Sequence, residues 1–280
     1  MLLTYIHGTV ADAFELEDVA ASRLLKQMAD MMVELAACKF DRIGCIFTND
    51  TGDFEIGTLL ETDSGPYKTA KEFYEAISEH RFHLYADQHL ANNTEATHDT
   101  GLHLPFLFNN LMRMFSNSAV DDGPFGLTNT DFGFHNILID EKMNIVGLID
   151  CDSIMAAPIH VVAQPPRFCG VNIAIPGIKD TNPFVVEFAA KSREKFDAFV
   201  ELVAAAEKNT DVATPISKAM HSDGAMLVAG LDGYTGLQGW RNMDWINGYW
   251  YLYYRRLRGD CVCHYSCAPL LTEIQVLRRL

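Results

Sequence analysis

Three polar residues near the middle of the chain have the types and the order that metal-assisted group transfer requires. Asp131 is followed in the segment Leu127–Ile139 by Asn136, and Asp150 comes after a further apolar run. Carboxylate and amide oxygens suit Mg²⁺, which usually takes one or two protein oxygens together with waters and substrate phosphates. A remaining carboxylate at such a site can accept a proton from an attacking hydroxyl.

A β-hairpin is predicted to bring these three residues together. The apolar runs Ile137–Ile139 and Ile145–Ile149 flank the polar stretch Asp140–Asn144, which is the pattern of a tight hairpin with a polar tip. Because the open ends of a hairpin meet, we expect Asn136 and Asp150 to lie side by side. Asp131 is expected on the loop that precedes the first strand of this hairpin.

The other elements are predicted from apolar periodicity and from capping signals. Thr69 and Glu72 form a capping box, which indicates the start of a long helix. Leu104–Phe115 is almost wholly apolar and is expected to be a buried helix. Further helices are predicted at Glu17–Cys38, from Pro183 through Val203 and at Met243–Arg258, and a second hairpin is predicted to turn at Asn49–Asp53. The sequence therefore predicts an α+β fold, mostly helical, with small β-hairpins and one compact unit over 1–280.

Composition and charge narrow the class of protein. The chain has 280 residues, of which 49% are hydrophobic, and its formal net charge is −15. That acidity argues against binding to nucleic acid and suits a cationic or metal-bridged ligand. The sequence shows no membrane-spanning stretch and no secretory signal, so we expect a cytoplasmic protein with no membrane partner and with mostly reduced cysteines.

The central segment resembles the catalytic loop and the metal-binding strand of the aminoglycoside phosphotransferase and choline kinase group, a branch of the protein-kinase-like fold. In this resemblance Asp131 matches the catalytic aspartate, Asn136 the metal-binding asparagine and Asp150 the metal-binding aspartate. The matched catalytic loop and metal-binding hairpin cover 127–152. The resemblance implies the C-terminal helical lobe of that fold, with ATP and Mg²⁺ as cofactors.

The similarity extends beyond the motif. Leu2–Gly8 is similar to the hinge that ends the nucleotide lobe, so residues 1–8 are interpreted as a hinge remnant with Thr4 as a cofactor-binding residue. Gly57–Tyr74 and Ala156–Arg167 are similar to segments of the fungal phosphotransferase-like proteins in this group.

Two departures from the group affect the expected activity. Related enzymes usually carry histidine two residues before the catalytic aspartate, and this chain carries Asn129, so we expect a less rigid loop. The chain also begins at the segment similar to the hinge, so the N-terminal ATP lobe is expected to be absent. Because phosphoryl transfer depends on positioning and charge neutralisation, that absence would impair the reaction strongly.

The resemblance therefore implies an ATP- and Mg²⁺-dependent transfer of phosphate to the hydroxyl of a small molecule, with a cationic acceptor suiting the acidic chain. Two other functions stay open. One is a non-catalytic, pseudokinase-like module that binds a ligand or a partner. The other is a fold recruited for a different small-molecule reaction.

Several residues have both a structural and a functional interpretation. Asp140 and Asp152 are read as turn or capping residues rather than extra ligands, and His135 as a loop residue rather than a substrate contact. The cluster Cys261, Cys263, His264 and Cys267 is read as free thiols, with zinc as the alternative. An aromatic cluster is read as core, with a substrate-pocket lining or surface that the absent lobe would have covered as the alternative. An exposed apolar patch of that origin would favour a homodimer. The cluster comprises Trp240, Trp245, Tyr249, Trp250, Tyr251, Tyr253 and Tyr254.

Overall fold

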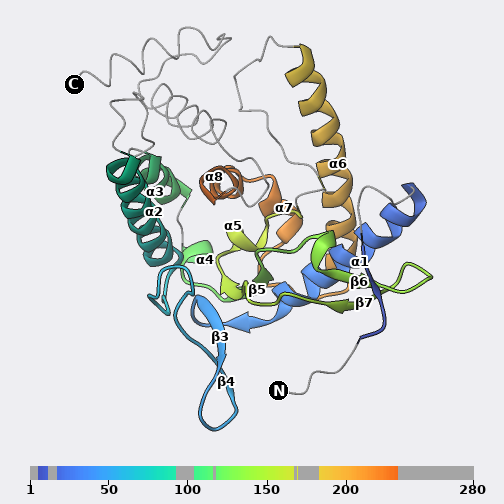
Figure 1. Ribbon diagram of the computed structural model, residues 1–280, viewed down its shortest axis with the longest axis horizontal. Coiled ribbons are helices and arrows are strands. Elements are labelled where there is room, and N and C mark those ends of the chain that lie inside the picture. Colours follow the sequence, from blue (N-terminus) through green and yellow to red (C-terminus); the bar gives the residue numbers. More distant parts are fainter. Residues whose placement is uncertain are drawn as a thin grey trace.

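The computed structural model describes residues 6–11, 18–92, 104–115, 118–166, 169 and 183–232. Helices and antiparallel strands both contribute, which agrees with the predicted α+β class (Figure 1). The helices are α1 (Asp18–Ala37), α2 (Ala70–Asn92), α3 (Leu104–Phe115), α4 (Ser118–Asp121), α5 (Ile159–Val162), α6 (Pro183–Glu207), α7 (Ile216–Met220) and α8 (Asp223–Asp232), with a short 3-10 helix η1 (Phe134–Asn136). The strands are β1 (Thr9–Val10), β2 (Lys39–Phe40), β3 (Gly44–Thr48), β4 (Phe54–Ile56), β5 (Phe125–Asn129), β6 (Ile137–Ile139), β7 (Ile145–Leu148) and β8 (Ile154–Ala157).

The larger sheet has five strands in the order β2-β5-β8-β3-β4. Its centre is the antiparallel pair β5–β8, in register from Gly126 opposite Ala157 to Asn129 opposite Ile154. The β3–β4 hairpin within it was predicted, and that prediction is confirmed. The sequence predicted only small hairpins, whereas the structure also pairs β5 with β8. This pair was missed because the two strands are distant in sequence.

The smaller sheet, β1-β6-β7, contains the predicted hairpin around the candidate site. Its polar tip is organised by Asp140, whose Oδ1 accepts hydrogen bonds from the backbone N–H groups of Lys142 and Asn144, both at 2.8 Å. The bond from the Asn144 N–H is the main reason why the pKa of Asp140 lies below its usual value. Gln27 of α1 then anchors the tip, since its Oε1 accepts from the Ile145 N–H at 3.0 Å. Asp140 is thus a turn residue, as predicted.

The start of α2 confirms the predicted capping box. The Thr69 Oγ1 accepts a hydrogen bond from the Glu72 N–H at 3.1 Å, and the Glu72 Oε2 accepts one from the Lys68 N–H at 2.9 Å. The first bond satisfies a backbone donor that the first helical turn leaves without a partner, and the second holds the chain just before the helix.

Helix α1 lies between two hydrophobic clusters and against β5. Its residues Met32 and Val33 belong to the main core, whereas Leu24 and Met28 pack with Phe134 in a smaller cluster under β6. Close packing on β5 depends on Gly126, where a Cβ would lie 2.9 Å from the Ala36 carbonyl oxygen. The helix therefore connects the main core to the sheet that carries the candidate site.

The predicted helix α3 is present, and it is buried on one face only. Phe108 and Leu111 are in the core. The helix itself lies beside α2 (Figure 1). Phe106 and Met114 are 57% and 45% exposed. An apolar sequence does not reveal which face of a helix meets the core, because that depends on its neighbours.

Several predictions fall outside the residues that the structure describes. These are Thr4 with most of the hinge segment 1–8, the helix Met243–Arg258, the Cys261–Cys267 cluster and the aromatic cluster Trp240–Tyr254. Among the helices that are described, none combines the length and the apolar character needed to cross a membrane.

Candidate functional site

The loop from β5 to β6 is held in place by alternate aromatic residues. Phe134 is 6% exposed and packs in the smaller cluster with residues of α1, and the partly buried Phe132 contacts both clusters. The Asn136 N–H donates to the Gly133 carbonyl oxygen at 3.0 Å and closes the turn of η1. The polar residues between these anchors are therefore presented by a loop with a defined backbone.

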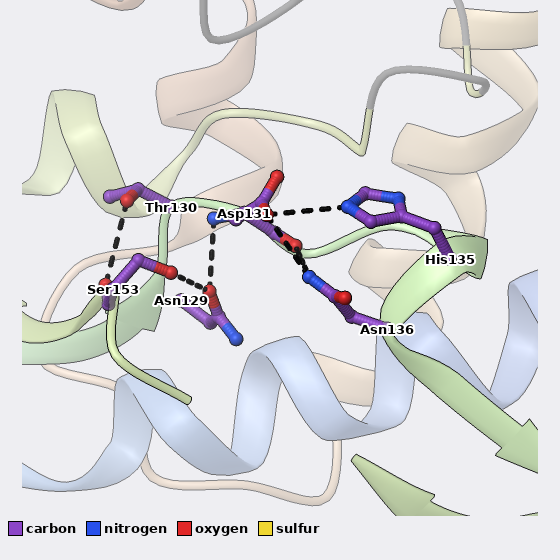
Figure 2. Close-up of polar contacts among 6 residues, drawn as sticks. All are labelled: Asn129, Thr130, Asp131, His135, Asn136 and Ser153. Carbon is purple, nitrogen blue, oxygen red and sulfur yellow. Dashed lines mark hydrogen bonds and ion pairs between the residues drawn. The ribbon is translucent and has the colours of Figure 1, made fainter. Parts of the chain in front are cut away.

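Asp131 and Asn136 are in direct contact (Figure 2). The Asn136 Nδ2 donates to the Asp131 carbonyl oxygen at 3.0 Å and to its Oδ2 at 3.1 Å. Asn136 is 4% exposed, whereas the Asp131 side chain is 43% exposed. Among the described residues nothing hydrogen-bonds the Oδ1 of either side chain, so both oxygens are available to a ligand.

His135 lies beside the Asp131 carboxylate and is exposed. Its Nε2 stands 3.3 Å from the Asp131 Oδ2, the same oxygen that Asn136 contacts. The imidazole covers Gly133, where a Cβ would lie 2.5 Å from the ring. The sequence predicted a loop role for His135 and did not predict this contact with Asp131.

Asp150 directly follows the part of the hairpin that pairs with Asn136. The Ile149 N–H donates to the Asn136 carbonyl oxygen at 2.9 Å, so the backbone pairing of β6 with β7 continues up to the residue before Asp150. Asp150 is exposed and has a φ of 56°, a left-handed conformation that is uncommon for residues other than glycine. Such backbone conformations occur preferentially at functional sites.

Asn129 connects this loop to the chain that follows Asp150. Its Oδ1 accepts hydrogen bonds from the Asp131 N–H at 2.9 Å and from the Ser153 Oγ at 2.5 Å. The Thr130 N–H donates to the Ser153 carbonyl oxygen at 3.3 Å, and the Thr130 Oγ1 donates to the same oxygen at 3.5 Å (Figure 2). Sequence reasoning did not identify Ser153, and it expected Asn129 to loosen the loop. The only sequence signal was the position of Ser153 shortly after Asp150.

The donor set fits a hard divalent cation that also binds phosphates. Within the described part of the chain no group of three or more His, Cys, Asp or Glu side chains gathers as a metal site. The candidate ligands are instead one amide oxygen, from Asn136, and one carboxylate, from Asp150. This small set matches Mg²⁺, which completes its shell with waters and substrate phosphates, better than zinc.

A hollow of about 290 Å³, open solvent included, lies between α2, α3, α4 and α5, and Tyr74, Met112 and His160 are among the residues that line it. Burial lowers the pKa of His160 to about 4, so this imidazole is neutral at pH 7. None of Asp131, Asn136 and Asp150 lines this hollow.

Comparison with known proteins identifies a family for this chain. A family model described as the phosphotransferase enzyme family matches residues 1–161, a range that includes Asn129, Asp131, Asn136, Asp150 and Ser153. Neither a curated protein nor a solved structure matches the chain.

Proposed function

The chain belongs to the phosphotransferase enzyme family, and from this premise we propose that it transfers the γ-phosphate of ATP to a hydroxyl group of a small molecule, with Mg²⁺ as the metal. The observation that carries the proposal is the contact between Asp131 and Asn136. This contact uses the Asn136 amide nitrogen and one Asp131 oxygen, and leaves an oxygen of each residue free for a ligand.

Asp131 is the residue that receives the acceptor. Its Oδ2 is held by Asn136, so its Oδ1 has a defined direction and can accept the hydrogen bond of a substrate hydroxyl. In the reaction the hydroxyl oxygen bonds to the γ-phosphorus while the bond between that phosphorus and the bridging oxygen of ADP breaks. The hydroxyl proton passes to the Asp131 carboxylate, and ADP leaves.

Asn136 and Asp150 are the residues that would hold the metal. The Asn136 Oδ1 is turned away from Asp131 because its Nδ2 donates there, and Asp150 lies on the paired strand end. When bound, Mg²⁺ neutralises charge on the phosphates of the nucleotide. The role of this chain is then to keep its two oxygen ligands close to the Asp131 carboxylate.

The charge of the chain favours a cationic acceptor. A formal net charge of −15 produces a negative potential that raises the local concentration of cations. We therefore expect small hydroxylated amines to be better acceptors than neutral or anionic alcohols of similar size.

The test is Mg·ATP binding by calorimetry, together with ATP turnover in the full chain. Asp131→Asn should lower turnover by about 10²- to 10⁴-fold, the range for loss of a general base, with Mg·ATP binding retained. Asp150→Ala should weaken Mg·ATP binding. Asp152→Ala is the matched control, since this exposed carboxylate lies two residues further along, and it should change neither quantity.

Turnover and Mg·ATP binding that are absent from both the wild type and Asp150→Ala would refute the proposal. That result, combined with thermal stabilisation by a cationic small molecule that needs neither metal nor nucleotide, would favour the non-catalytic binding module.

A further inference from the structure

Asn129 occupies a position from which one side chain reaches two loops. It is the last residue of β5, opposite Ile154 of β8, and it is 5% exposed. Its Oδ1 accepts from the Asp131 N–H at 2.9 Å and from the Ser153 Oγ at 2.5 Å. Asp131 lies on the loop after β5, and Ser153 lies on the loop before β8. The two bonds therefore join these loops directly beyond the last strand pair.

We propose that Asn129 and Ser153 are positioning residues for the phosphoryl transfer, and that their link holds Asp131 against the segment that carries Asp150. The inference rests on the proposed function. The sequence predicted that Asn129 would leave this loop less rigid, whereas we infer that Asn129 and Ser153 together support it.

The geometry explains why the link affects Asp131 in particular. Asn136 holds the Asp131 carbonyl and carboxylate oxygens, while Asn129 holds its backbone N–H. The residue is thus held at both ends of its own backbone unit, and its carboxylate has little freedom to turn. Without Asn129, the N–H of Asp131 loses the hydrogen bond that it makes in this structure.

The chemistry of the amide suits this arrangement. An amide oxygen has two lone pairs and can accept from both donors at once. The orientation of the side chain follows from the Asp131 N–H, which is a donor and must face the oxygen. The Asn129 Nδ2 is buried and has no hydrogen-bond partner among the described residues. Within the described part of the chain, the Asn129 side chain thus uses its oxygen but not its nitrogen in hydrogen bonds. Because a buried donor without a partner destabilises the folded state, this arrangement favours a role in positioning over one in stability.

The experiment measures amide hydrogen exchange and ATP turnover in the full chain, with Asn129→Ala, Ser153→Ala, Ser153→Thr and the double alanine variant. Loss of about one or two neutral hydrogen bonds should raise exchange at the Asp131 amide about tenfold or more in Asn129→Ala. Exchange of the β5 amides at Gly126–Thr128 should stay at the wild-type rate.

Turnover should show the same pattern. Asn129→Ala should lower kcat about tenfold or more while the KM for ATP stays within about twofold, because Asp131 is displaced and the nucleotide ligands are not. Ser153→Ala should have a smaller effect, and Ser153→Thr should match the wild type because it keeps the hydroxyl. The double variant should be no worse than Asn129→Ala, since the Asn129 oxygen is common to both bonds.

The outcomes separate the two proposals. If exchange at Asp131 is unchanged in Asn129→Ala, or rises equally along β5, the positioning role is wrong. If Asp131 exchange rises as expected but the wild type shows no turnover, the link exists and the proposed function fails. If turnover is present and equal in Asn129→Ala and the wild type, the link does not serve catalysis. Should Asn129→Ala fail to fold, the contrast between Ser153→Ala and Ser153→Thr decides on its own.

Discussion

Asn136→Asp is the substitution that tests the central contact of the site most directly. It replaces the amide nitrogen of Asn136, which lies 3.0 Å from the Asp131 carbonyl oxygen and 3.1 Å from its Oδ2, by a carboxylate oxygen. The side chain keeps its size and shape. Two hydrogen bonds are lost, and two carboxylates then face each other at pH 7.

The expected loss of stability follows from this distance and from the exposure of the two groups. Two unit charges separated by about 3.1 Å repel by about 1.3 kcal/mol at the dielectric constant of water and by about 5 kcal/mol at an effective value of about 20. Asn136 is 4% exposed, but the Asp131 side chain is 43% exposed, so the lower half of that range applies. With the lost hydrogen bonds added, we expect the free energy of unfolding to fall by about 2 to 4 kcal/mol.

Urea unfolding at pH 7 and low salt, with EDTA present so that no metal offsets the repulsion, measures this change. The matched control is the exchanged pair Asp131→Asn with Asn136→Asp, which restores one amide donor and one carboxylate acceptor. It should regain most of the lost stability without regaining turnover. Equal stability of Asn136→Asp and the wild type, or an exchanged pair no more stable than Asn136→Asp alone, would show that the two side chains do not meet as described.

Two further predictions concern parts of the fold outside the candidate site. Burial lowers the pKa of His160 to about 4, so between pH 6.5 and pH 4 this histidine binds a proton in the unfolded protein but not in the folded one. Its contribution to the free energy of unfolding is therefore complete above pH 6.5 and is lost as the pH falls from 6.5 to 4. His160→Gln should remove up to about 3 kcal/mol of this pH dependence in urea unfolding from pH 7 to 4. Gly44→Ala should cost about 3 kcal/mol, because its Cβ would lie 2.0 Å from the Gly57 carbonyl oxygen, whereas Gly52→Ala, in open space, should cost about 1 kcal/mol for its positive φ.

The elements predicted correctly from sequence are those whose signals are local. The Thr69–Glu72 capping box, the helix from Pro183 and the hairpin tip at Asp140–Asn144 each depend on residues a few positions apart. Turn and capping residues act through hydrogen bonds to nearby backbone, so their types and spacing suffice to place them.

The five-stranded sheet was not predicted, because its central pairing joins distant parts of the chain. The two central strands, Phe125–Asn129 and Ile154–Ala157, are short and pair with each other. The loop that carries Asp131 and the β6–β7 hairpin separate them in the sequence. The exposed residues of α3, such as Phe106, were misjudged for a related reason. Burial depends on which elements pack against a face, and composition alone does not contain that information.

At the candidate site, the order of residue types by itself determined that Asp131, Asn136 and Asp150 are the candidate residues. Metal ligands and a proton acceptor must be of those types, and the hairpin pattern predicts that the chain returns to Asn136. Tertiary structure alone decided that the Asn136 nitrogen meets Asp131 and that Asn129 reaches Ser153. Those contacts require atoms from separate loops to lie within about 3 Å of each other. Such closeness results from the packing of α1 under the loop and of β5 against β8, which sequence patterns do not specify.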